Sequence, residues 1–216
     1  FFSGELKNIQ NQDAYLNFVT VTNDQYIVTA SKPHSGKTGI YIWGLENLEL
    51  VDSQEFSNDL MINSITLLDN KKVAFSLSPE DLSTRDTIWI WDFTEKNTSP
   101  TLVLRCNSDV QSVAPIPAEK IILLQDDENA KRVIAFDYEK LEIVDTLSIS
   151  SNVEKIAVSP DGKKIAISSE EYISLYNRNT GEVIANNLEH GAEIIALFFS
   201  QSNDLISVSK DSVVKI

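Results

Sequence analysis

Few residues in this chain have the type and spacing that acid–base or metal chemistry requires. A histidine can titrate near neutral pH, so His190 is a candidate general base or metal ligand. The chain has one other histidine, His34, and no carboxylate stands at ligand spacing from His190. A metal ion would therefore lack second and third ligands. We expect neither a metal nor a cofactor, and we interpret His190 as a structural residue.

A short stretch, Ser35–Thr38, is similar to the end of a phosphate-binding loop. The complete motif needs a glycine five residues before Gly36, where Ser31 stands, and a helix after it. Pro33 interrupts the stretch, and a strand-like run follows instead of a helix. No helix N-terminus would then face a phosphate. We interpret the stretch as an ordinary loop.

Two other kinds of site also lack support in the sequence. The acidic run Asp126, Asp127 and Glu128 could offer oxygens to Ca²⁺, but it lacks alternating ligand spacing and a central glycine. Neither a Gly-x-Ser-x-Gly elbow nor a His-Glu-x-x-His pair occurs in the chain. We therefore expect a protein that is not an enzyme.

Composition narrows the classes of partner. Acidic residues outnumber basic ones, 32 to 18, and the formal net charge is −14. Such a charge repels phosphate backbones and anionic lipids, so we expect no direct nucleic-acid binding, no membrane binding, and an attraction for basic protein segments. Cys106 is the only cysteine. With no secretory pattern and no run long enough to span a bilayer, we expect an intracellular location, in the cytoplasm or nucleus.

Internal repetition organises the chain. A β-like run that ends on an aromatic residue recurs at intervals of 41, 48, 45 and 40 residues, and a further 41 residues lead to the position after Ile216. Such a period, with four strands per unit, is typical of propeller blades. The closing aromatics are Phe2, Trp43, Trp91, Phe136 and Tyr176.

Turn residues occupy matching places in each repeat, between two apolar β-runs. The hairpin turns are Asn23–Asp24, Asp69–Asn70, Ala118–Glu119, Asp161–Gly162 and Asn203–Asp204. Outer strands are predicted after the aromatics, at Leu48–Val51, Leu102–Leu104, Leu141–Val144 and Thr180–Val183. We therefore predict an all-β propeller of four-stranded antiparallel blades. Residues 1–216 form one array of about five repeats, with repeat ends at 2, 43, 91, 136, 176 and the C-terminus.

The last repeat resembles a WD-repeat of the β-propeller family. His190 is followed four residues later by a β-run at Ile194, and Asp211 precedes three β-formers. Trp91-Asp92 is the one literal Trp-Asp pair, and Glu189 stands where the family has glycine. The resemblance implies a buried hydrogen-bonded tetrad. Its members would be His190, Ser207 or Ser209, Asp211 and an aromatic one residue beyond Ile216.

Three repeats carry extra residues between their second and third strands. The insertions are Lys32–Gly39, Ser78–Asp86 and Asp126–Lys131. The resemblance places these loops on one face, beside the central channel, where binding residues tend to lie. Neutral insertion of residues into surface loops, which costs little stability, explains these extra residues equally well. The candidate partner-binding residues are Lys32, His34, Lys37, Glu80, Asp81, Arg85, Asp126, Asp127 and Glu128.

The expected function is a non-catalytic protein–protein interaction scaffold within a hetero-complex. The alternatives are a propeller enzyme with a hydrolase-like site in the channel, or a lipid- or nucleic-acid-binding propeller. Phosphoinositide-binding propellers carry a Phe-Arg-Arg-Gly signature, and Lys131-Arg132 does not fit it. The last blade should lack an outer strand. Either Gly4–Gln10 supplies it and closes a five-bladed ring, or the chain is an excerpt of a longer, typically seven-bladed propeller, which we favour.

Overall fold

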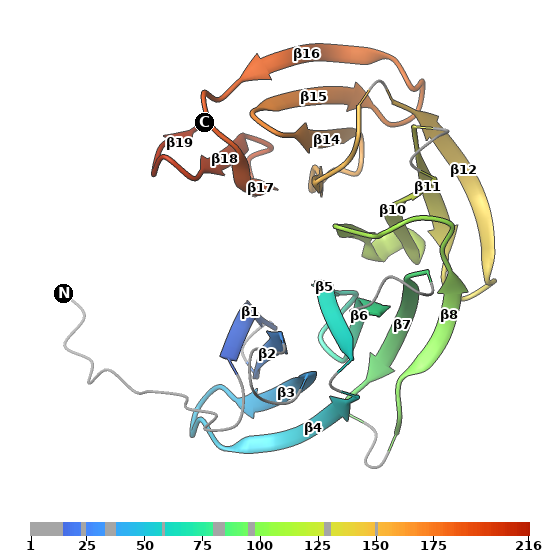
Figure 1. The fold of residues 1–216 in the computed structure, drawn as a ribbon, viewed down its shortest axis with the longest axis vertical. Helices are drawn as coiled ribbons and strands as arrows, with labels where there is room; N and C mark the ends of the chain where they lie inside the picture. Colours follow the sequence, from blue (N-terminus) through green and yellow to red (C-terminus); the bar gives the residue numbers. More distant parts are fainter. Residues whose placement is uncertain are drawn as a thin grey trace.

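The chain folds as an all-β propeller, as predicted. The computed structural model describes residues 15–22, 25–32, 38–57, 59–79, 85–94, 98–127, 131–149 and 151–216. Five antiparallel sheets form the blades, four with four strands and the last with three. The blades lie around a common centre, and the arc that they form is open between the first and last blades (Figure 1).

The first three blades each pair their strands in chain order. Blade 1 contains β1 (Tyr15–Val21), β2 (Tyr26–Lys32), β3 (Thr38–Gly44) and β4 (Leu50–Phe56). Blade 2 contains β5 (Leu60–Leu67), β6 (Lys72–Pro79), β7 (Thr87–Asp92) and β8 (Thr101–Arg105). Blade 3 contains β9 (Val113–Ile116), β10 (Ile121–Asp127), β11 (Arg132–Asp137) and β12 (Glu142–Ser148), with a 3-10 turn, Pro117–Glu119, after β9.

The last two blades follow the same order. Blade 4 contains β13 (Lys155–Val158), β14 (Lys164–Ser169), β15 (Tyr172–Asn177) and β16 (Val183–Glu189). Blade 5 contains β17 (Ile194–Phe199), β18 (Leu205–Ser209) and β19 (Val214–Lys215). No helix in the described ranges is long and apolar enough to cross a bilayer.

Three of the four predicted outer strands begin later than the sequence predicts, whereas β8 begins one residue earlier, at Thr101. Leu48 and Leu141, predicted as strand residues, adopt φ angles of 57° and 60°, and Gly181 has a φ of 71° at the matching place. In each turn this residue donates its N–H to the carbonyl four residues earlier, at 2.9 Å. The aromatic and the turn are thus followed by a left-handed residue before the strand starts. Glycine signals this conformation in the sequence, whereas leucine does not.

The core lies between successive blades. Trp91, Phe136 and Tyr176 are almost fully buried and lie in the third strands of their blades. Each aromatic belongs to an apolar cluster that includes side chains of the preceding blade; Tyr176, for example, lies with Leu123 and Val133. Burying such a side chain contributes about 2–3 kcal/mol to stability. The closing aromatic therefore joins two blades.

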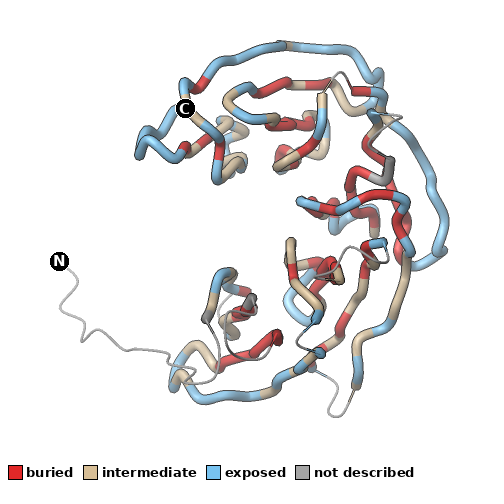
Figure 2. The backbone as a smooth tube through the Cα atoms, in the orientation of Figure 1, coloured by how far each residue is buried: buried red, intermediate tan, exposed pale blue. Residues whose placement is uncertain are grey.

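Exposure increases from the inner strands to the rim. Figure 2 shows the outer strands β12 and β16 mostly exposed, whereas the second and third strands carry most of the buried residues. One ion pair crosses two blades away from this core. The guanidinium of Arg178 lies 2.5 Å from the carboxylate of Glu119 and donates to both of its oxygens.

The last blade has three strands among the described residues, and β19 forms its outermost edge. Among the described residues, β19 pairs only with β18. Phe2 and the Gly4–Gln10 segment, which we predicted to close one possible ring, lie outside the described residues. The prediction that this blade lacks an outer strand is therefore confirmed for the part of the chain that the structure describes.

Candidate functional site

The predicted partner-binding loops are only partly described. His34, Lys37, Glu80, Asp81 and Glu128 lie outside the described residues. Of the remaining positions, Lys32 ends β2, Asp126 and Asp127 end β10, and Arg85 is exposed shortly before β7. A role for these loops in binding partners stays a prediction.

One of these loops does not end at the surface. Ser78 and Asp86, the two ends of the second predicted insertion, are 2% and 1% exposed. Oδ2 of Asp86 accepts the N–H of Val110 in the next blade, at 2.6 Å. Burial raises the pKa of Asp86, whereas its hydrogen bonds with Ser78 and Val110 oppose that shift. The ends of this insertion therefore belong to the junction of blades 2 and 3.

At the next two blade junctions, the backbone N–H at the equivalent position also finds an acceptor in the preceding blade. The N–H of Val153 donates to Oε1 of Gln125 at 2.9 Å. At the next junction, the N–H of Ile194 donates to the carbonyl oxygen of Glu170, also at 2.9 Å. Our sequence reasoning missed Asp86 and Gln125. No spacing rule marks them, because their partners are backbone groups of another blade.

The predicted tetrad residues come together as two pairs. The hydroxyl of Ser209 donates to Oδ1 of Asp211, and this bond lowers the pKa of the Asp211 carboxyl. Nε2 of His190 faces the carbonyl oxygen of Ser207 at 3.4 Å. Within the described residues, Nδ1 of His190 is buried and has no hydrogen-bond partner. The closed tetrad stays a prediction, since among the described residues these side chains form two separate pairs and Asp211 is exposed.

A hydroxyl–indole pair of the expected kind occurs instead in blade 1. Nε1 of Trp43 donates to Oγ1 of Thr29 at 2.8 Å, and both residues are buried. We did not predict Thr29. The strand pattern places Thr29 near Trp43. Ile27 pairs with Trp43 across β2 and β3, and Thr29 stands two residues after Ile27 on the same face of the strand.

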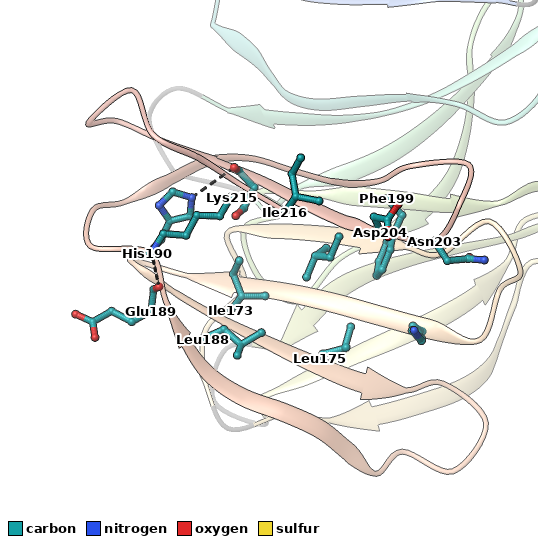
Figure 3. A pocket seen from close by; sticks show the side chains of 13 residues that line it. Ile173, Leu175, Leu188, Glu189, His190, Phe199, Asn203, Asp204, Lys215 and Ile216 are labelled. Atoms are coloured by element: carbon teal, nitrogen blue, oxygen red, sulfur yellow. Dashed lines mark hydrogen bonds between the residues drawn. The ribbon is translucent and has the colours of Figure 1, made fainter.

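An apolar cavity lies between blades 4 and 5. It has a volume of about 640 Å³ and is open to solvent (Figure 3). We call it the end groove. Ile173, Leu175 and Leu188 of blade 4 line it together with residues of blade 5, which are Phe199, Leu205, Ser207, Lys215 and Ile216. Apolar side chains therefore form most of its wall.

Polar groups stand at the ends of the groove. His190 lies at one end, and the ammonium of Lys215 donates to the carbonyl oxygen of Glu189 at 3.0 Å (Figure 3). Asp204 and Lys164 lie on its lining. Hydrogen bonds from Ser202 and Ser200 lower the pKa of Asp204, so its carboxylate is ionised at neutral pH.

This arrangement suits binding of an extended segment. The groove offers an apolar floor, charged side chains on its lining, and an adjacent strand edge. No group of three or more residues in the described ranges could hold a metal ion. A comparison with protein-family models and with curated protein sequences finds no match.

Proposed function

We propose that the chain is a non-catalytic protein-interaction scaffold of the WD-repeat type, serving as a subunit of a multiprotein complex. The observation that carries the proposal is the end groove beside the edge of β19, which pairs only with β18 among the described residues. A partner strand added to such an edge gains main-chain hydrogen bonds, and a neighbouring pocket supplies specificity for its side chains. The exposed Val213, Val214 and Ile216 lie along this edge and would be covered.

The charge of the chain favours one kind of partner. A net charge of −14 attracts basic protein segments and repels nucleic acids and anionic membranes. The proposal includes an intracellular location, because the single cysteine gives the chain no intrachain disulfide. The WD-repeat assignment rests on the Thr29–Trp43 and Ser209–Asp211 pairs.

Affinity purification with two matched variants tests the scaffold role. Leu188→Glu places a charge in the groove, whereas Ile143→Glu places one on the outer strand of blade 3. Both side chains are about half exposed, at 44% and 48%, so neither change should unfold the chain. Partners identified by mass spectrometry should be retained by wild type and Ile143→Glu and lost with Leu188→Glu. Identical partner sets for all three proteins, or turnover in a hydrolase screen, would contradict the proposal.

A further inference from the structure

The outer strand β4 of blade 1 presents two exposed apolar side chains on the rim of the propeller. Among the described residues β4 pairs only with β3, and its other side faces outward (Figure 1). Leu50 and Val51, at the start of the strand, are 50% and 54% exposed. Ile143 and Val183, which pair with their closing aromatics as Leu50 does, are similarly exposed. The blades of these two residues have a neighbouring blade on either side, so the rim position itself accounts for this exposure.

Carboxylates flank this apolar pair. Glu49 stands directly before it and Asp52 directly after it, which gives the order acidic, apolar, apolar, acidic. Within the part of the chain that the structure describes, no ion pair involves Glu49 or Asp52. Residues 38–70 contain no basic residue and six acidic ones, which are Glu46, Glu49, Asp52, Glu55, Asp59 and Asp69. The start of β4 therefore combines an apolar patch with negative charge that no basic residue nearby in the sequence compensates.

The same order recurs at one other outer strand, where basic residues compensate the charge. Glu142 and Asp145 flank the exposed apolar pair of β12. The ammonium of Lys140 lies 4.0 Å from the carboxylate of Glu142, and Asp145 interacts electrostatically with Arg178 of blade 4. The corresponding parts of β8 and β16 lack one or both acidic residues. Blade 3 therefore offers a matched control for blade 1, with the same backbone pairing and a different charge.

The charges select one kind of occupant for the edge of β4. A second copy of this edge would place carboxylates opposite carboxylates, and like charges directly opposite destabilise a strand pair. Nucleic acid and anionic lipid are repelled for the same reason. An extended protein segment with a basic residue on each side of two apolar residues matches the charges in either strand direction, because the order is symmetric. Its main chain can also form hydrogen bonds with the edge strand.

We propose that the outer edge of β4 binds an extended segment of a partner protein with the order basic, apolar, apolar, basic, which adds a fifth strand to blade 1. The apolar residues of the segment cover Leu50 and Val51, and its basic residues lie at Glu49 and Asp52. The lining of the end groove includes no residue of blade 1. The inference therefore goes beyond the proposed function and concerns a second, separate surface.

Fluorescence anisotropy with a synthetic peptide tests the inference. The labelled probe is Thr-Thr-Lys-Val-Ile-Lys-Thr-Thr with blocked ends, titrated with the purified chain at low salt. Replacing Val-Ile with two serines keeps the charge and should weaken binding at least about tenfold, because the apolar contact is lost. Methylating the backbone nitrogens of the four central residues keeps the side chains and should weaken binding at least about tenfold, because the strand can no longer pair. Replacing both lysines with glutamate should abolish binding.

Matched variants of the chain locate the peptide on β4. Leu50→Ser should weaken binding about fivefold, whereas Ile143→Ser, at the equivalent and equally exposed place in β12, should leave it unchanged. Glu49→Gln should weaken binding about threefold at low salt and less at high salt, since exposed charges are screened. Glu142→Gln removes one carboxylate at the equivalent place and should leave binding unchanged. Leu188→Glu, in the end groove, should bind the probe as wild type does.

The inference is overturned if the probe fails to bind, or if its serine or methylated versions bind as tightly. Equal effects of the β4 and β12 variants would show that basic peptides follow only the net charge of the chain, and would also overturn it. Loss of probe binding in Leu188→Glu would place the peptide in the end groove and overturn it as well. The scaffold function is tested separately, by the partners that Leu188→Glu loses from the affinity purification.

Discussion

Replacing Asp86 tests whether the blades are joined by buried polar contacts. Asp86→Ala removes the acceptor of the Val110 N–H, a backbone group in a residue that is fully buried. It also removes a partner of the Ser78 hydroxyl. Leaving a buried donor unpaired costs about 1–3 kcal/mol, and the carboxylate's own desolvation offsets part of this. We expect the free energy of unfolding to fall by about 2 kcal/mol in urea denaturation monitored by tryptophan fluorescence.

The pH dependence of stability provides a sharper measurement. Burial raises the pKa of Asp86 above its ordinary value of 3.8, so the folded chain binds a proton more tightly than the unfolded chain. The contribution of this group to stability is complete below pH 3.8 and is lost as pH rises through its folded pKa. Asp86→Asn keeps an acceptor for Val110 and removes the titration. Relative to wild type, it should be less stable near pH 4 than near pH 7.

A surface carboxylate provides the control for this experiment. Glu142 begins the outer strand β12 and is exposed, and its ion pair with Lys140 lies within blade 3, so Glu142→Gln removes one charge without touching a blade junction. Its stability relative to wild type should not follow the pattern of Asp86→Asn. If Asp86→Asn shows the same stability difference at both pH values, burial of the carboxyl is not the dominant influence on it. If Asp86→Ala is as stable as wild type, the junction does not depend on this bond.

Two further changes test pairs within blades. Thr29→Val should lower the free energy of unfolding by about 1 kcal/mol, because the buried Trp43 N–H loses its acceptor. A double-mutant cycle with Trp43→Phe should show coupling, and additive effects would argue against the bond. Asp211→Ala should lower the melting temperature only slightly, since Asp211 is exposed and its bond with Ser209 is local; a large loss would favour the closed tetrad after all.

The architecture could be predicted from the sequence because strand pairing requires aromatic and turn residues to recur at regular intervals. Four of the predicted closing aromatics lie in β3, β7, β11 and β15, and hairpin signals such as Asp161–Gly162 fall in real turns. Gly162 adopts a φ of 70° and donates its N–H to Ser159. Where a leucine takes the left-handed conformation, as at Leu141, the local signal is absent and the strand start was misplaced.

The candidate site was much less predictable. The end groove is lined by side chains from six different strands, so no local spacing of residues predicts it. His190 and Ser207 were identified, but as parts of a closed network rather than as groove lining. Their actual orientation depends on how β18 and β19 pair, which a residue pattern does not determine.

The blade junctions explain why the repeats can differ so much in sequence. A carboxylate at Asp86, an amide at Gln125 and a backbone carbonyl at Glu170 all accept the same kind of backbone N–H from the following blade. Strand pairing sets the position and direction of the donor, and any oxygen that reaches it satisfies the donor. Selection at such a position acts on geometry more than on residue type. A propeller can therefore keep its period and strand order after its signature residues are lost.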